Sequence, residues 1–173
     1  MNHSDTELTS TKVLEFLTIA NEFARITEEA ATYPGEHVKS FLQRILPLLY
    51  LKASLLPDVE PSDPEQNERF VTEETWENCL NRYREIFGEE DSYWDIEDSC
   101  SDEPEPVKRS LAEDLADIYQ ETKDFVQLYQ KPLTASRENA VASCKLYFEE
   151  QWGVKALRAA SRIHHILHFV HHA

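Results

Sequence analysis

Glycine is scarce in this chain of 173 residues, and each glycine separates two apolar patterns. Gly35, Gly88 and Gly153 stand where runs of apolar residues at three- and four-residue spacing stop or restart. Such runs form one face of an α-helix, so these glycines are expected to mark helix ends. The scarcity also excludes phosphate-binding loops, dinucleotide fingerprints and nucleophile elbows, because each needs glycines at fixed spacing. The pattern therefore predicts an all-α fold.

The helical spacing of apolar residues extends over six stretches of the chain. They are residues 10–31, 38–56, 73–87, 107–131, 135–152 and 154–170. Pro47 lies inside the second stretch and lacks a backbone N–H, which predicts a kink or a break there. Short connections join the first stretch to the second, the fourth to the fifth and the fifth to the sixth, and they favour antiparallel neighbours. The expected fold is a single domain over residues 1–173, an antiparallel bundle of five or six helices.

Two segments between the helices are expected to be exposed acidic loops. Residues 57–70 contain three prolines and five acidic residues, a composition typical of a surface loop. Residues 89–106 contain nine acidic residues and neither lysine nor arginine, so charge repulsion is expected to keep most of them extended. The second segment lacks the glycine and the ligand spacing of an EF-hand, which argues against calcium binding.

Charge, hydropathy and cysteine content limit the partners and the compartment. The net charge of −16, from 33 acidic and 17 basic residues, repels nucleic-acid phosphates and anionic lipids. The longest apolar run, residues 45–51, is far shorter than the ~20 residues of a membrane-spanning helix. The first residues show no secretory signal, and the three cysteines lack CxxC spacing, which favours reduced thiols. We therefore expect a cytoplasmic protein that binds neither nucleic acid nor membranes.

Three short stretches, which together span most of the chain, carry a family resemblance. They are Leu46-Pro47-Leu48-Leu49-Tyr50 with Leu55-Leu56-Pro57, then Asp114-Leu115-Ala116-Asp117-Ile118-Tyr119-Gln120 with Lys123-Asp124-Phe125, and Trp152-Gly153 with Ala156-Leu157-Arg158. These stretches resemble an uncharacterised bacterial all-helical family known only as a domain of unknown function. The resemblance implies a single helical domain, and it implies no activity, cofactor or partner.

Histidines and acids could together form a divalent-metal site. Five of the seven histidines lie in the last helix, where His164 and His168 are one turn apart and could share a metal. The fourth helix carries an acidic stripe, formed by Glu113, Asp117, Glu121 and Asp124. If the two helices are neighbours, stripe and histidines could hold a metal between them. The alternative is that the histidines border the core near a helix C-terminus, which favours positive charge, and that the acids form a solvated face.

Two acidic pairs indicate a catalytic alternative. The segments 74–77 and 121–124 reproduce the ExxE and ExxD pairs of the all-α nucleotide pyrophosphatases, whose magnesium sites are built from such pairs. The two pairs are further apart here than in that family, and a chain with 33 acidic residues forms such pairs readily by chance. The alternative function is a metal-dependent hydrolase that acts on a nucleotide or a phosphorylated small molecule.

Apolar bulk interrupts the second acidic segment at Tyr93, Trp94 and Ile96. Large aromatic residues in a charged segment either dock onto their own domain or anchor a partner. Docking is favoured, because an exposed cluster of this kind promotes aggregation. No catalytic motif stands out elsewhere in the chain, so the expected function is non-catalytic and acts through contacts with another protein.

Overall fold

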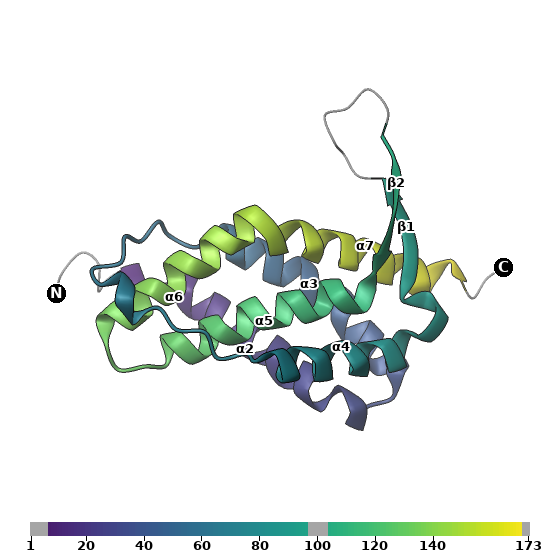
Figure 1. Cartoon of the computed structure of the whole chain (residues 1–173), viewed down its shortest axis with the longest axis horizontal. Helices are drawn as coiled ribbons and strands as arrows, with labels where there is room; N and C mark the ends of the chain where they lie inside the picture. The colour runs from purple at the N-terminus through teal and green to yellow at the C-terminus, as the bar shows by residue number, and fades with distance from the viewer. Residues whose placement is uncertain (1–6, 97–103, 171–173) are drawn as a thin grey trace.

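Helices form most of the computed structural model, which describes residues 7–96 and 104–170 (Figure 1). The α-helices are α2 (Thr11–Glu29), α3 (Gly35–Ser54), α4 (Glu73–Phe87), α5 (Leu111–Tyr129), α6 (Thr134–Tyr147) and α7 (Gly153–His168). Short 3-10 turns are η1 (Ala30–Thr32), η2 (Pro64–Gln66) and η3 (Gly88–Glu90), while η4 (Phe148–Trp152) is a π-helix. Two strands, β1 (Ser92–Ile96) and β2 (Pro106–Ser110), complete the fold. The expected all-α single domain is confirmed, with one small sheet added.

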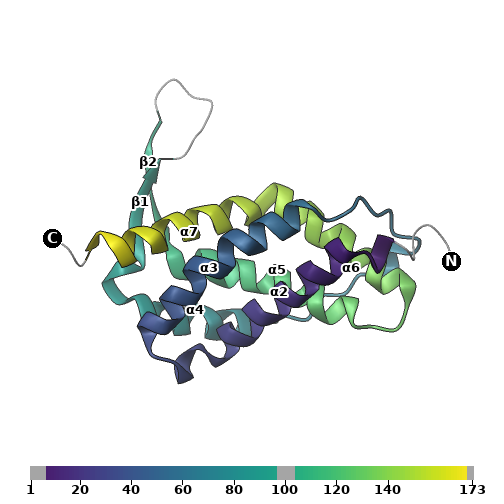
Figure 2. The ribbon, with the colours of Figure 1, turned by 180° about the vertical axis from the view of Figure 1, so that it is seen from behind.

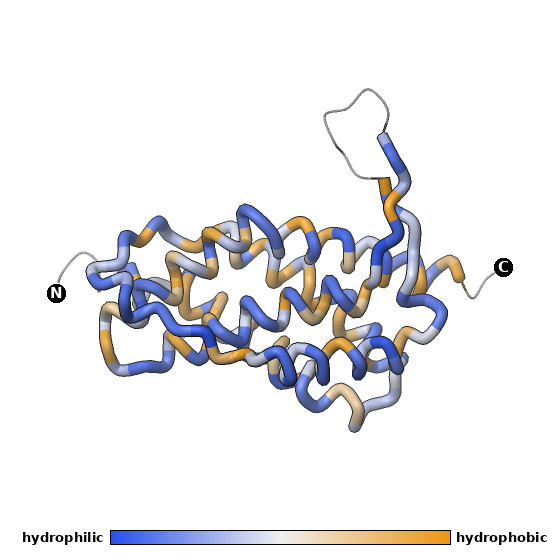
Figure 3. The backbone as a smooth tube through the Cα atoms, viewed as in Figure 1, coloured by the Kyte–Doolittle hydropathy of each residue, from blue (hydrophilic) through white to orange (hydrophobic). Residues whose placement is uncertain are grey.

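The core surrounds α5, which packs against α2, α4, α6 and α7. Apolar residues alternate with polar ones along each helix (Figure 3), as expected when one stripe of a helix faces the core. Aromatic rings fill the centre: Phe16 lies 4.8 Å from Phe125 and 6.3 Å from Trp152, measured between ring centroids. All three side chains are buried. Within the described residues, none of the helices combines the length and the apolarity needed to cross a membrane.

Pro47 does not break α3 in two. The helix continues through it from Gly35 to Ser54, although proline removes one backbone donor. Leu46 and Leu49 on either side of Pro47 are fully buried, so their packing holds the helix against α2 and α7. The side chain of Pro47 itself is exposed. Tertiary packing therefore outweighs the local preference of proline.

The fifth and sixth expected helices are not antiparallel neighbours. Helix α6, the π-turn η4 and α7 follow one another as one continuous, bent rod (Figure 2), and α7 packs mainly on α3 and α5. Gly153 lies inside this rod: a Cβ atom there would come within 2.6 Å of the Phe148 carbonyl oxygen. The glycine therefore permits close approach of the backbone at the π-turn, and it does not end a helix.

The second acidic segment is partly a β-hairpin and not wholly a loop. Strands β1 and β2 pair antiparallel, with Tyr93 opposite Arg109, and the hairpin projects away from the bundle (Figure 1). Residues 107–110 were expected to begin the fourth helix, but they belong to β2, and α5 begins at Leu111. Residues 97–103, also part of the expected loop, lie outside the described residues.

The first acidic segment is a loop, as expected, apart from η2. It is tied to α6, because the Glu138 carboxylate accepts hydrogen bonds from the backbone N–H and the hydroxyl of Ser62, at 2.8 and 2.5 Å. The Asn139 amide donates to the backbone carbonyl of Asp63 at 2.8 Å. These contacts fix the segment that continues along the chain to Arg69 and α4.

Candidate functional site

The hairpin, here called the hairpin arm (β1 and β2), presents two large apolar side chains to solvent. Side chains alternate between the faces of a strand, so Trp94 and Ile96 share one face of β1. Their exposed fractions are 71% and 65%. Across the arm they stand opposite Lys108 and Pro106, which are also exposed. These four residues form the outer face of the arm.

The inner face of the arm docks onto the bundle through Tyr93. Its ring is half-buried and lies under the guanidinium of Arg162, 5.4 Å from the ring centroid. Its hydroxyl donates to Asp114 Oδ2 at 3.3 Å. Burial raises the pKa of Tyr93 to about 12, so the phenol stays protonated and keeps this bond. Of the three apolar residues in the acidic segment, Tyr93 therefore docks and the other two remain exposed.

The root of the arm is fixed by Asp91, which is buried. Its carboxylate accepts the Ala112 N–H at 2.7 Å and the Ser110 hydroxyl at 3.0 Å. Its backbone carbonyl accepts the Leu111 N–H at 2.9 Å. A hairpin of two strands is marginal on its own, and these bonds attach it to the first turn of α5. The outer face is thus held in a defined direction.

An open cleft of about 530 Å³ lies between β1 and α7. Arg158 and Arg162 on α7 and Trp94 on β1 line it, together with His165. Arg158 pairs with Asp114 at 2.8 Å. Burial lowers the pKa of the Arg158 guanidinium, but the hydrogen bond to Asp114, the charge of Asp114 and Tyr93 together outweigh that effect, so the pKa is raised overall. The cleft therefore sets cationic and aromatic groups beside the exposed Trp94.

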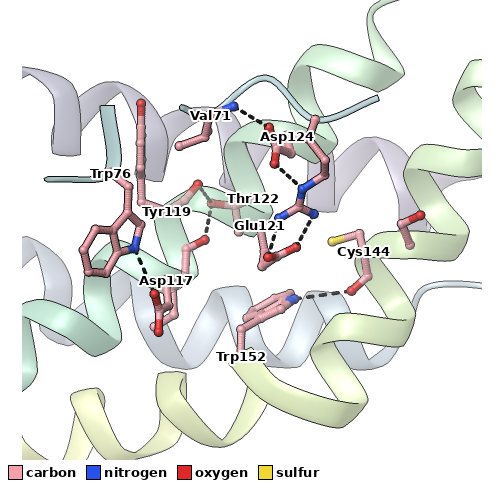
Figure 4. Close-up of polar contacts among 12 residues, drawn as sticks. Val71, Trp76, Asp117, Tyr119, Glu121, Thr122, Asp124, Cys144 and Trp152 are labelled. Atoms are coloured by element: carbon pink, nitrogen blue, oxygen red, sulfur yellow. Dashed lines mark hydrogen bonds and ion pairs between the residues drawn. The ribbon is translucent and has the colours of Figure 1, made fainter. Parts of the chain in front are cut away.

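The acidic stripe of α5 is exposed at one end and inserted into the bundle further along. Glu113 is exposed and pairs with Arg84 at 3.2 Å. Asp117 accepts the indole N–H of Trp76 at 2.9 Å (Figure 4) and forms an ion pair with Lys155. These contacts join α5 to α4 and α7. A metal ion at Asp117 would have to displace a lysine.

The other end of the stripe binds a single arginine from the first acidic loop. The guanidinium of Arg69 contacts both oxygens of Glu121, at 2.6 and 2.7 Å, and lies 2.8 Å from Asp124. Asp124 is buried and also accepts the backbone N–H of Phe70 at 2.7 Å and that of Val71 at 2.9 Å (Figure 4). Burial raises the pKa of Asp124 although these three donors lower it. The arrangement attaches the loop to α5.

The two candidate histidines face α3, away from the acidic stripe. The rings of His164 and His168 lie 4.5 Å apart, and both contact the side-chain amide of Gln43. The stripe and the histidines thus have different partners. Within the described residues, no three His, Cys, Asp or Glu side chains are grouped to hold a metal ion. His171 and His172 lie outside the part of the chain that the structure describes.

Comparison with known proteins gives a family and a structural relative. Residues 7–169 match a family described as a domain of unknown function (DUF5063). The crystal structure of a protein from Bacteroides fragilis, a structural genomics target, is similar, with a TM-score of 0.84. The sequences are 34% identical, and the match covers 94% of this chain and 96% of that chain. No significant match is found among curated proteins.

Proposed function

The chain belongs to the DUF5063 family of domains of unknown function, and we propose that it is a non-catalytic protein that binds another protein through the outer face of its hairpin arm. One observation carries this proposal. The arm projects from the bundle (Figure 1) and holds Trp94 and Ile96 at 71% and 65% exposure on one face.

The free energy gained by burying apolar side chains favours a state in which a partner covers Trp94 and Ile96. Burying a large apolar side chain contributes about 1.5–3 kcal/mol relative to leaving it exposed, and tryptophan is enriched among the residues that dominate binding energies. Neither Trp94 nor Ile96 belongs to the buried core. Because Tyr93 anchors the arm to the bundle, the next residue, Trp94, is held facing solvent in a position suited to binding a partner.

Charge supports a partner that differs from this chain. A second copy would bring a further net charge of −16 to the complex, and net charges of the same sign disfavour association. We therefore propose a protein other than this chain, with an apolar groove that receives Trp94 and Ile96, and a nucleic acid is disfavoured because the net negative charge repels its phosphates. The proposed compartment is the cytoplasm. Cys79 and Cys144 support that setting, because both are buried, free thiols and disulfides are rare there.

Site-specific photo-crosslinking tests the proposal. A benzophenone amino acid replaces Trp94 in one variant and Leu146 in a matched variant, since Leu146 is also exposed, at 48%, but lies on α6. In cells that express the chain, we expect a discrete adduct from position 94 that position 146 does not give. The Ile96→Ser substitution added to the first variant should reduce the adduct. The same adducts from both positions, or an adduct with the mass of two copies, would contradict the proposal.

A further inference from the structure

Two imidazole rings and one amide converge at the interface of α3 and α7. Gln43 Nε2 lies 3.3 Å from His164 Nδ1 and 2.7 Å from His168 Nε2. A side-chain NH2 group only donates hydrogen bonds, so with the amide in this orientation both ring nitrogens accept. Each therefore directs an unprotonated lone pair towards the same point. The helices hold this arrangement together, because α3 packs along α7 (Figure 2).

Unprotonated imidazole nitrogens are strong ligands for divalent transition metals. Two histidines one turn apart on a helix can bind the same ion, at about 2.0–2.1 Å from each nitrogen. If the Gln43 side chain moves back from the point of convergence and its amide turns end for end, a metal ion can occupy that point and the Gln43 carbonyl oxygen becomes its third ligand. The two histidines are exposed, so water can complete the coordination.

We propose that His164, His168 and Gln43 form a binding site for a divalent transition metal, with zinc as its representative ion. The site does not use the acidic stripe, whose inner carboxylates already bind Lys155 and Arg69. It is also separate from the outer face of the hairpin arm, so the test of this site does not depend on the proposed function. Because the ligands come from α3 and α7, the bound ion crosslinks two helices and stabilises the fold.

Nitrogen ligands determine which ions bind. Imidazole favours zinc, copper and nickel, whereas magnesium and manganese favour carboxylate and water oxygens. The site is therefore expected to distinguish zinc from magnesium. This preference separates it from a hydrolase site built on the carboxylates of α5.

Isothermal titration calorimetry on the untagged full chain tests the site. Wild-type protein should bind one zinc ion at this site and show no magnesium binding there. His164→Ala and His168→Ala should each weaken zinc binding at least tenfold. His165→Ala is the matched control, because His165 lies on the same helix and stacks on Phe169 at 5.4 Å, and it should change the affinity less than twofold. Gln43→Glu should strengthen binding, since a carboxylate is a better ligand than an amide.

One further variant, with two substitutions, completes the test. His171→Ala combined with His172→Ala should leave the zinc affinity within twofold, and circular dichroism should show unchanged helicity in every variant. Absence of zinc binding to the wild type would overturn the proposal. So would loss of binding in the His171 and His172 double variant while His164→Ala retains it, because the last residues would then be the ligands.

Discussion

The hydroxyl of Tyr93 lies 3.3 Å from Asp114 Oδ2 and joins the hairpin arm to the central helix α5. Asp114 also binds Arg158 of α7 at 2.8 Å, so one buried carboxylate connects the arm with two helices. Tyr93 and its neighbour Trp94 therefore have different roles: Tyr93 holds the arm against the bundle, whereas Trp94 is exposed to solvent.

Substitutions at these neighbouring positions should therefore differ in their effect on stability. We expect Tyr93→Ala to lower the free energy of unfolding by about 1–2 kcal/mol, because it removes half-buried aromatic packing and a hydrogen bond. Trp94→Ala should change it by less than about 0.5 kcal/mol, as for other exposed side chains. Urea denaturation measures both values. An equal or larger loss for Trp94→Ala would contradict the assigned roles.

Gly153 should be much less tolerant of alanine than Gly35. A Cβ at Gly153 would lie 2.6 Å from the Phe148 carbonyl oxygen, whereas a Cβ at Gly35 would first meet Ile86 at 3.7 Å, an ordinary contact. We expect Gly153→Ala to destabilise by about 1–3 kcal/mol through overpacking. Gly35→Ala should be neutral or slightly stabilising. Thermal unfolding of the two variants compares them, and equal melting temperatures would refute the close approach at the π-turn.

The raised pKa of Asp124 predicts a pH dependence of stability. Burial raises this pKa above its usual value of 3.8, so the folded state binds more protons than the unfolded state in the interval between the two values. Stability contributed at this position should therefore fall as the pH rises from about 3.8 through the raised pKa. Urea denaturation from pH 3 to pH 8 gives the free energy of unfolding of wild type and of Asp124→Asn, and the variant's value is subtracted from that of wild type. This difference should fall as the pH rises, and a difference that rises with pH would contradict the expected sign.

Helix positions were largely predictable from the sequence, because apolar spacing reports which face of each helix is buried. The N-terminus of α4 was predicted as well: the Thr72 side chain caps it by accepting the Thr75 N–H at 3.2 Å. The hairpin arm was missed for two reasons. Val107 and Leu111 also fit the helical spacing of α5, and the pairing partner of β1 lies beyond a run of acidic residues that predicts no strand.

The joint between α6 and α7 was misjudged because glycine has two uses. Gly153 fits the pattern of a helix end, but it serves the close approach to Phe148 inside a continuous rod. Sequence spacing gives no sign of a contact between a glycine and the previous turn when the turn is a π-helix. The short connection was therefore interpreted as a reversal of direction.

The candidate site residues were found more readily than their partners. Helical spacing correctly placed the acids of α5 in one stripe and His164 beside His168. Their partners Arg69, Lys155 and Gln43 come from other elements, and periodicity within one helix contains no information about them. Asp91, which fixes the root of the arm, was hidden among eight other acids of its segment.

The central claim is that the outer face of the hairpin arm binds a protein partner, and the affinity of the crosslinked partner tests it most directly. Isothermal titration calorimetry compares wild type with Trp94→Ser plus Ile96→Ser, and with a matched pair, Leu133→Ser plus Leu146→Ser, whose residues are exposed elsewhere. We predict at least a tenfold loss of affinity for the arm variant and less than a twofold change for the matched pair. Equal affinities of the arm variant and wild type would contradict the account.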